Sequence, residues 1–132
     1  MARVLALVPD LLFGSRVQGA LSSAGHEVEL IADASRLHAR LCDAPLQAGT
    51  VLIVDLTGED LDGSGLRESL LLEGKLAGVA TLAFYSHVDT PVRERAERAG
   101  FDLVVPRSRM SREGPALVAR LAGRARLSSA EP

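Results

Sequence analysis

The sequence of 132 residues contains one cysteine (Cys42), one lysine (Lys75) and no tryptophan, and aromatic residues make up only 3% of it. A single cysteine excludes an intramolecular disulfide and any metal site built from several cysteines. So few aromatic side chains leave little to stack on nucleic-acid bases. No apolar run reaches about 18 residues, so the sequence predicts no membrane span. These absences suit a reducing cytoplasm, and the preference for arginine over lysine is typical of a bacterial protein.

Two further absences restrict the classes of function that the sequence allows. There is no Gly-rich phosphate-binding loop of the dinucleotide or kinase type. A formal net charge of −2 gives no general attraction to nucleic acid or to an anionic membrane. The apolar stretch at residues 4–8 ends at Pro9 and Asp10, too soon for a secretory signal, so we interpret it as a first buried strand. We therefore expect one globular domain with neither nucleic acid nor a membrane as its partner.

What the sequence does contain is a strand pattern followed by a helix pattern, repeated five times. Such alternation with short connections predicts a parallel sheet with helices on both faces. Five strands favour the order 2-1-3-4-5 of a flavodoxin-like three-layer α/β sandwich. We expect a domain over residues 1–127, with its last helix beginning around Pro115, and a disordered tail over residues 128–132. Strands are predicted at residues 3–8, 26–31, 50–56, 79–85 and 101–105.

The third predicted strand ends in a single carboxylate, Asp55, directly before a Leu-Thr-Gly turn. Its uninterrupted aliphatic residues are typical of a strand buried on both faces. Open α/β sheets place their ligand crevice at the carboxyl ends of the strands, so Asp55 is a candidate functional residue. The predicted topology brings Asp10, Ser86 and Arg107 to the same edge. Asp55 could also simply cap the turn that follows it, and both interpretations stay open.

Three segments resemble the receiver domains of response regulators, and together they extend over almost the whole chain. Residues 3–28 align without a gap with the opening of a receiver, as far as the Ala-Gly-His-Glu-Val turn. Residues 51–56 match the segment that ends in the phospho-accepting aspartate. Residues 97–105 match the Glu-x-Ala-Gly-x-Asp stretch that leads into the last strand.

The resemblance implies a role for each candidate residue on the strand-end edge. Asp55 stands in the place of the phospho-acceptor. Ser86, or Tyr85 after a shift of one residue, stands in the place of the hydroxyl that contacts the phosphoryl group. Arg107 takes the place of the switch lysine that follows the last strand. These residues are the equivalents of a receiver site.

The metal-binding half of a receiver site is replaced in this sequence. Val8 and Pro9 stand where receivers have two acidic residues that hold Mg²⁺, and Asp10 comes one residue late. Mg²⁺ requires oxygen ligands in near-octahedral geometry, which Asp55 alone supplies poorly. Without the metal, the charge that develops on a transferred phosphoryl group goes largely unneutralised. We therefore expect a degenerate acidic pocket, a pseudo-receiver without a metal or another cofactor.

These features favour a stand-alone atypical receiver, not an enzyme, that takes part in two-component signal transduction. In the family, the surface that meets partners is formed by the fourth helix, the fifth strand and the fifth helix. In this sequence that surface corresponds to residues 90–100 and 101–126. We expect it to contact a protein partner or a second copy of the chain.

Two alternatives remain. The first is a phospho-accepting receiver with Asp55 as the acceptor and Arg107 as the switch cation. The second is a small-molecule-binding domain whose strand-end crevice is lined by Pro9, Phe13, Tyr85 and the loop at residues 58–65. No general base, nucleophile or cofactor loop can be named for an enzyme. Arginines crowd the C-terminal segment, but no nucleic-acid-reading motif accompanies them, so we interpret them as a solvated helix face.

Overall fold

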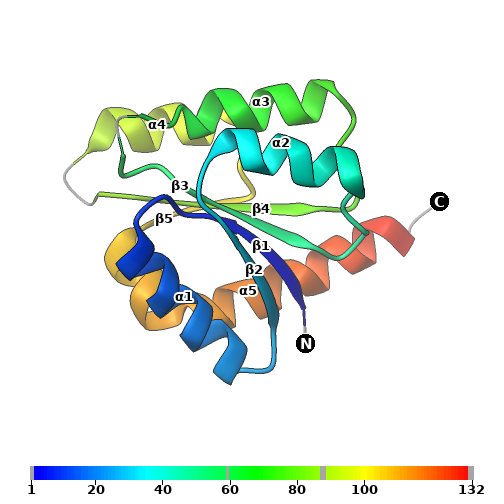
Figure 1. Ribbon diagram of the computed structural model, residues 1–132, viewed down its shortest axis with the longest axis horizontal. Coiled ribbons are helices and arrows are strands. Elements are labelled where there is room, and N and C mark those ends of the chain that lie inside the picture. The colour runs from blue at the N-terminus through cyan, green and yellow to red at the C-terminus, as the bar shows by residue number, and fades with distance from the viewer. Residues whose placement is uncertain (1, 59, 87–88, 131–132) are drawn as a thin grey trace.

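The computed structural model describes residues 2–58, 60–86 and 89–130, with side chains as far as Arg124. It contains a five-stranded sheet and five helices that alternate along the chain (Figure 1). The strands are β1 (Arg3–Leu7), β2 (Glu27–Ile31), β3 (Val51–Asp55), β4 (Ala80–Tyr85) and β5 (Leu103–Pro106). The helices are α1 (Leu11–Ser23), α2 (Ala34–Asp43), α3 (Gly63–Leu72), α4 (Thr90–Ala99) and α5 (Arg107–Ala130).

The sheet has the order β2-β1-β3-β4-β5, and every neighbouring pair of strands is parallel. This confirms the predicted flavodoxin-like topology. Helices α1 and α5 cover one face of the sheet, and α2, α3 and α4 cover the other (Figure 1). Because β1 and β3 are neighbours, Asp10, which follows β1, lies near the end of β3.

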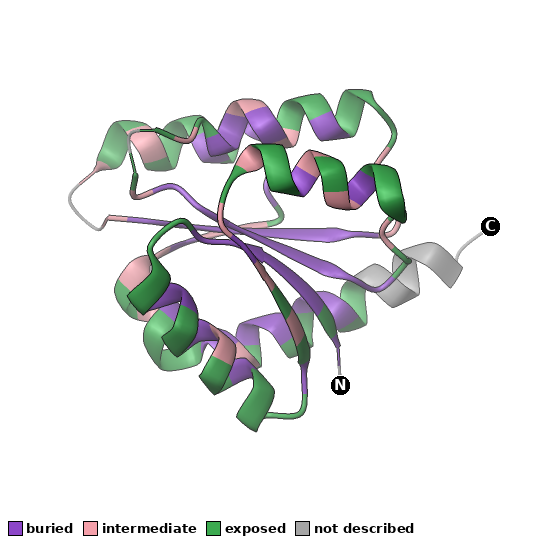
Figure 2. Ribbon diagram, viewed as in Figure 1, coloured by how far each residue is buried: buried purple, intermediate pink, exposed green. Residues whose placement is uncertain are grey.

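The core consists of two apolar layers, one on each face of the sheet (Figure 2). All five residues of β3 are buried, as its aliphatic run predicts. Ile53 points into the layer beneath α1 and α5, whereas its neighbour Leu52 points into the layer beneath α2, α3 and α4. Within the described residues, no helix combines the length and apolar composition needed to cross a bilayer.

Four helices begin at an aspartate whose side chain accepts a hydrogen bond from the backbone of the first turn. Such caps satisfy N–H groups that have no partner inside the helix. Asp10 caps α1, Asp33 caps α2 and Asp89 caps α4. The fourth cap, Asp62, starts α3 at Gly63, so the predicted loop at residues 58–65 is shorter than expected.

Helix α5 differs most from the prediction. It begins at Arg107, directly after β5, and passes through Pro115, where we had expected the helix to start. The prediction was wrong because proline also fits a first turn, and the sequence alone does not show that residues before it are packed. Met110 and Gly114 are buried, which holds the preceding turns in place. The backbone of α5 extends to Ala130, into the predicted tail of 128–132, whose last two residues lie outside the described part of the chain.

Candidate functional site at the carboxyl ends of the strands

Asp55 is the last residue of β3 and is only 3% exposed. Its Oδ1 atom accepts two hydrogen bonds, from the Thr57 backbone N–H at 2.7 Å and from the Thr57 hydroxyl at 2.6 Å. Both donors lie two residues further along the chain, so the carboxylate closes the local turn with its own side chain. The turn-capping interpretation left open by the sequence is therefore realised. The second oxygen, Oδ2, takes no part in these bonds.

Asp10 uses both of its carboxylate oxygens. Oδ1 accepts from the backbone N–H groups of Leu12 (3.0 Å) and Phe13 (3.1 Å), which caps α1. Oδ2 accepts from Nη2 of Arg107 at 3.2 Å. The Phe13 N–H first, and then the bond to Arg107 with its positive charge, lower the pKa of Asp10 below its ordinary value of 3.8. Both oxygens of the carboxylate are therefore engaged, one at the start of α1 and the other at the start of α5.

Arg107 is the first residue of α5 and points toward α1. Besides its bond to Asp10, its Cζ atom lies 4.0 Å from the centre of the Phe13 ring, a cation–π contact. The Phe13 ring in turn lies 5.1 Å, between centroids, from the ring of Phe84 in β4. The cation is thus held between a carboxylate and an aromatic ring, both supplied by the beginning of α1.

The remaining switch-site equivalent, Ser86, follows β4 and is half-buried. Its carbonyl oxygen accepts from the Asp89 N–H at 2.8 Å, in the turn that leads to α4. In the described part of the chain, no hydrogen bond or ion pair joins Asp55 to Ser86 or to Arg107. The fold brings the candidates to one edge of the sheet, but their contacts form two separate groups, Asp55 with Thr57 and Asp10 with Arg107.

The residues at the positions of the acidic pair do not fit a magnesium ion. Val8 is 3% exposed and belongs to the apolar core, and its N–H donates to the Ile31 carbonyl at 3.0 Å. Pro9 is exposed but carries no side-chain oxygen. Among residues 2–58, 60–86 and 89–124, no group of three His, Cys, Asp or Glu side chains could hold a metal ion. The oxygen ligands that Mg²⁺ prefers are therefore not assembled by these side chains.

The residues expected to line a small-molecule crevice lie in different parts of the molecule. Gly58 and the end of its loop line an open groove of about 450 Å³ between the start of α3 and the start of α4, with Asp89 and Arg95 opposite. Phe13 lines a separate groove between α1 and α5. Tyr85 is buried in the core layer beneath α2, α3 and α4.

Sequence reasoning missed Thr57 as the double donor to Asp55 and Phe13 as the ring beneath Arg107. A signal existed for the first, because a threonine two residues after an aspartate is a known turn pattern. For the second, the sequence placed Phe13 only in the lining of the strand-end crevice. Its contact with Arg107 depends on how α1 and α5 pack.

The fold is that of the receiver domains of response regulators. The receiver domain of TorR, from the TMAO respiratory system, superimposes with a TM-score of 0.79 at 18% identity, over 95% of this chain and 99% of that one. A response regulator from Chloroflexus aurantiacus gives 0.79 at 17% identity, over 92% and 98%. The receiver domain of a sensor histidine kinase from Pseudomonas aeruginosa, with magnesium coordinated in its cleft, gives 0.76 at 18% identity, over 92% and 98%.

One of the structures with the same fold is part of a much longer chain. NtrX from Brucella abortus matches 96% of this chain with 28% of its own length, at a TM-score of 0.79 and 18% identity. There the receiver-like unit is one part of a larger chain. No model of a known protein family matches the sequence, and no curated protein matches it. At these identities the likeness is one of fold.

Proposed function

We propose that this chain is an atypical receiver that takes part in two-component signal transduction through protein contacts, without Mg²⁺-dependent phosphorylation. The receiver fold supports the signalling role, because its similarity extends over nearly the whole chain. The replacement of the acidic pair supports the absence of metal-dependent chemistry.

The observation that carries this proposal is the state of Asp10. It is the nearest carboxylate in sequence to the acidic pair, and both of its oxygens are engaged, one by the cap of α1 and the other by Arg107. Moving it toward a metal beside Asp55 would leave the first N–H groups of α1 without an acceptor. It would also separate Arg107 from its carboxylate partner. Recruiting Asp10 as a metal ligand would therefore cost two interactions.

Phosphorylation can be tested by the mass of the intact protein. The chain is incubated with a small acyl phosphate donor and Mg²⁺, beside a receiver that retains both acidic residues as the positive control. We expect the control to gain the mass of one phosphoryl group and this chain to gain none. An adduct on this chain that disappears in the Asp55→Asn variant would overturn the proposal in favour of a phospho-accepting receiver.

A gain-of-function variant makes the physical reason testable. Pro9→Asp adds a carboxylate at an exposed position beside the end of β1. We expect it to raise the affinity for Mg²⁺ above that of the parent chain, measured by calorimetric titration. The exposed Gln47→Asp, which adds the same charge in the segment before β3, is the matched control and should leave Mg²⁺ affinity unchanged.

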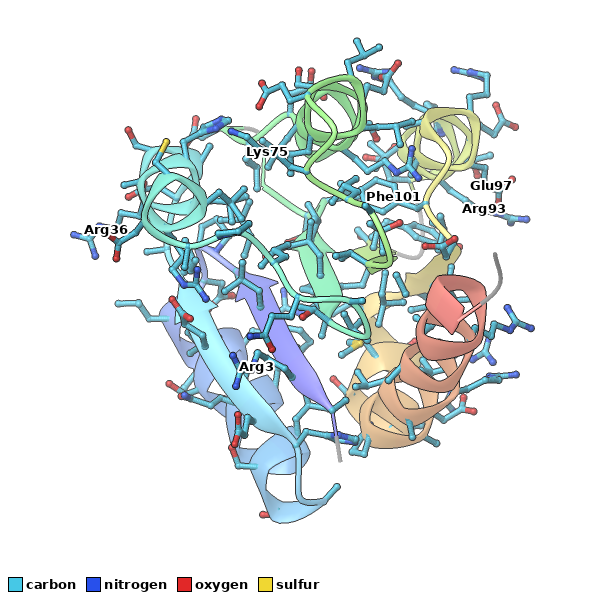
Figure 3. The ribbon with its side chains drawn as sticks, turned by 90° about the vertical axis from the view of Figure 1, so that its right-hand side faces the viewer. Arg3, Arg36, Lys75, Arg93, Glu97 and Phe101 are labelled. Atoms are coloured by element: carbon cyan, nitrogen blue, oxygen red, sulfur yellow. The ribbon has the colours of Figure 1, made fainter. Side chains whose placement is uncertain are left out.

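The surface that we propose for partner contact is formed by α4, β5 and α5. In Figure 3 this edge lies on the right-hand side and is seen in profile, with Arg93 and Glu97 projecting outward from α4. These two residues form an ion pair at 3.0 Å, and Arg109 and Glu113 form another on α5 at 3.2 Å. Such exposed pairs add little stability, so they are available to exchange for charges of a partner. We infer that this face meets a protein partner or a second copy of the chain.

A further inference from the structure

A second candidate site lies between α1 and α5, away from the contacts of Asp55. It is a groove of about 190 Å³ that opens to the solvent. Its apolar lining comes from one side of α1 and from the turn of α5 around Pro115. These lining residues are Phe13, Val17, Ala20, Met110, Gly114 and Pro115.

The groove exists because both helices carry small residues where they face each other. Ala20 leaves space on α1, and Gly114 leaves space on α5. A Cβ atom at Gly114 would come within 3.2 Å of the Met110 Cε atom, so even a methyl group there would crowd a side chain that lines the groove. Pro115 lies inside α5 and has no N–H, so it cannot donate to the Ser111 carbonyl one turn earlier. Ser111 itself lines the groove and offers a polar partner.

The charge at the groove is positive and unbalanced. Arg16 is the one charged residue in its lining, and no carboxylate lies beside it there. Among the described side chains, Arg16 takes part in no ion pair, whereas Arg107 and Arg109 nearby are both paired. An apolar floor with a single unpaired guanidinium at its edge is complementary to a molecule with an apolar body and an anionic head.

We propose that this groove binds a small amphiphilic anion, a carboxylate with a short hydrocarbon chain. If each methylene-sized group takes up about 30 Å³, the share of a water molecule in the liquid, the groove holds about six such groups. The chain lies against Val17, Ala20 and Met110, and the carboxylate reaches the Arg16 guanidinium. This site stands independently of the signalling function proposed above.

The groove is connected to the strand-end edge through Phe13. One side of this residue lines the groove, and its ring lies 4.0 Å below the Arg107 guanidinium. A ligand packed against Phe13 therefore fixes the ring on which Arg107 rests. Occupancy of the groove is expected to stabilise the contact between Arg107 and Asp10, and so the packing of α1 against α5.

Binding is measured by titrating the protein with hexanoate and following its backbone amide signals by NMR. We expect saturable shifts at Val17, Met110 and Gly114, with Arg107 responding in parallel. From butanoate to hexanoate, the dissociation constant should tighten about fourfold per methylene, as expected for burial of apolar surface. 1-Hexanol, which lacks the charge, should bind more weakly. Equal binding of the alcohol, or shifts spread evenly over the surface, would overturn the proposal.

Two pairs of variants separate the groove from general effects. Ala20→Leu fills the groove and should abolish saturable binding, whereas Ala39→Leu, at an exposed position on α2, should leave it intact. Arg16→Gln should weaken hexanoate binding about two- to fivefold, the range of an exposed ion pair, without changing 1-hexanol binding, and Arg98→Gln on α4 is its control. If Ala20→Leu binds hexanoate as tightly as the parent, the site lies elsewhere and the assignment is wrong. Concentration-dependent dimerisation that Ala20→Leu abolishes, with no hexanoate binding, would replace the ligand by a second copy.

Discussion

A shift of one position along the chain decides what the carboxylate of Asp10 can do. Directly after a strand, a side chain lies at the sheet edge, where receivers hold their metal. One residue later it becomes the residue before a helix, where two backbone N–H groups converge on one oxygen. Those N–H groups carry the positive end of the helix dipole and hold the carboxylate in its charged form.

The lowered pKa of Asp10 should therefore appear in the pH dependence of the free energy of unfolding. Its pKa in the folded protein is lowered, so its contribution to stability is complete above the ordinary value of 3.8 and is lost as pH falls through the lower folded value. Asp10→Asn keeps a side-chain oxygen for the cap but cannot titrate. We expect the free energy of unfolding of this variant to fall less steeply at acid pH than that of the parent protein. Urea unfolding at a series of values between about pH 6 and about pH 2 measures the difference. Identical profiles for the two proteins would contradict this assignment.

The contact between Arg107 and Phe13 can be measured by a double-mutant cycle. Arg107→Gln should lower the free energy of unfolding by about 0.5–1 kcal/mol, the range of a partly exposed cation–π contact. In a Phe13→Leu background the same substitution should cost less, because the ring is gone. Urea unfolding of the four proteins gives the coupling energy. A coupling of zero would mean that Arg107 and Phe13 are neighbours without attraction.

At the scale of elements, the start of a helix depends on local interactions where an aspartate caps it. Asp10 and Asp89 stand directly before α1 and α4, and each accepts a hydrogen bond from the first turn of its helix. The start of α5 was misplaced, since Pro115 fits a first turn as well as it fits the observed position. What decides between them is the burial of Met110 and Gly114 against the rest of the molecule. Local patterns carry no information on that packing.

The end of α4 provides a prediction at this scale. Gly100 has φ of +91°, and a Cβ atom there would lie 2.9 Å from Nη1 of Arg67. That guanidinium donates to the Ala99 carbonyl at 3.0 Å. Gly100→Ala should therefore destabilise the protein by about 1–2 kcal/mol, the cost of a left-handed conformation for an ordinary residue.

The matched control for this change lies in the middle of a helix. Gly19 is in α1, and a Cβ atom there would have no neighbour within 4 Å. Gly19→Ala should stabilise the protein by about 0.5–1 kcal/mol, because alanine loses less backbone entropy in a helix. Thermal unfolding of both variants tests the pair. Equal effects at the two positions would mean that backbone conformation does not decide the outcome.

At the scale of the whole molecule, the topology could be predicted because it follows from a few general rules. Alternating strands and helices with short connections allow few arrangements, and five units favour the observed one. The contacts at the strand ends could not be predicted in the same way. Whether Arg107 turns to Asp55 or to Asp10 depends on side-chain conformations, and both carboxylates lie at the same edge. Sequence periodicity does not distinguish them.

The two core layers should unfold together, because they share one sheet. Ile53→Ala and Leu52→Ala remove apolar volume from opposite faces of β3, and both parent side chains are fully buried. Each should cost about 2–5 kcal/mol. The 88% exposed Leu72 provides the control, since Leu72→Ala should change stability by less than about 0.5 kcal/mol. Calorimetry should show a single transition in every variant, and two separate transitions would mean that the layers are independent.

The bond between Asp10 and Arg107 joins residues that are 97 positions apart in the chain. During synthesis, α1 emerges from the ribosome long before α5. The Phe13 ring and the Asp10 carboxylate are therefore present before Arg107, with which both later make contact. The strands β1, β2 and β3 can begin to pair in that interval, whereas the face of the sheet beneath α1 and α5 stays partly uncovered until α5 arrives. Closure of this bond therefore requires the start of α1 and the start of α5 to be in place together, and a probe at Arg107 would report on that step.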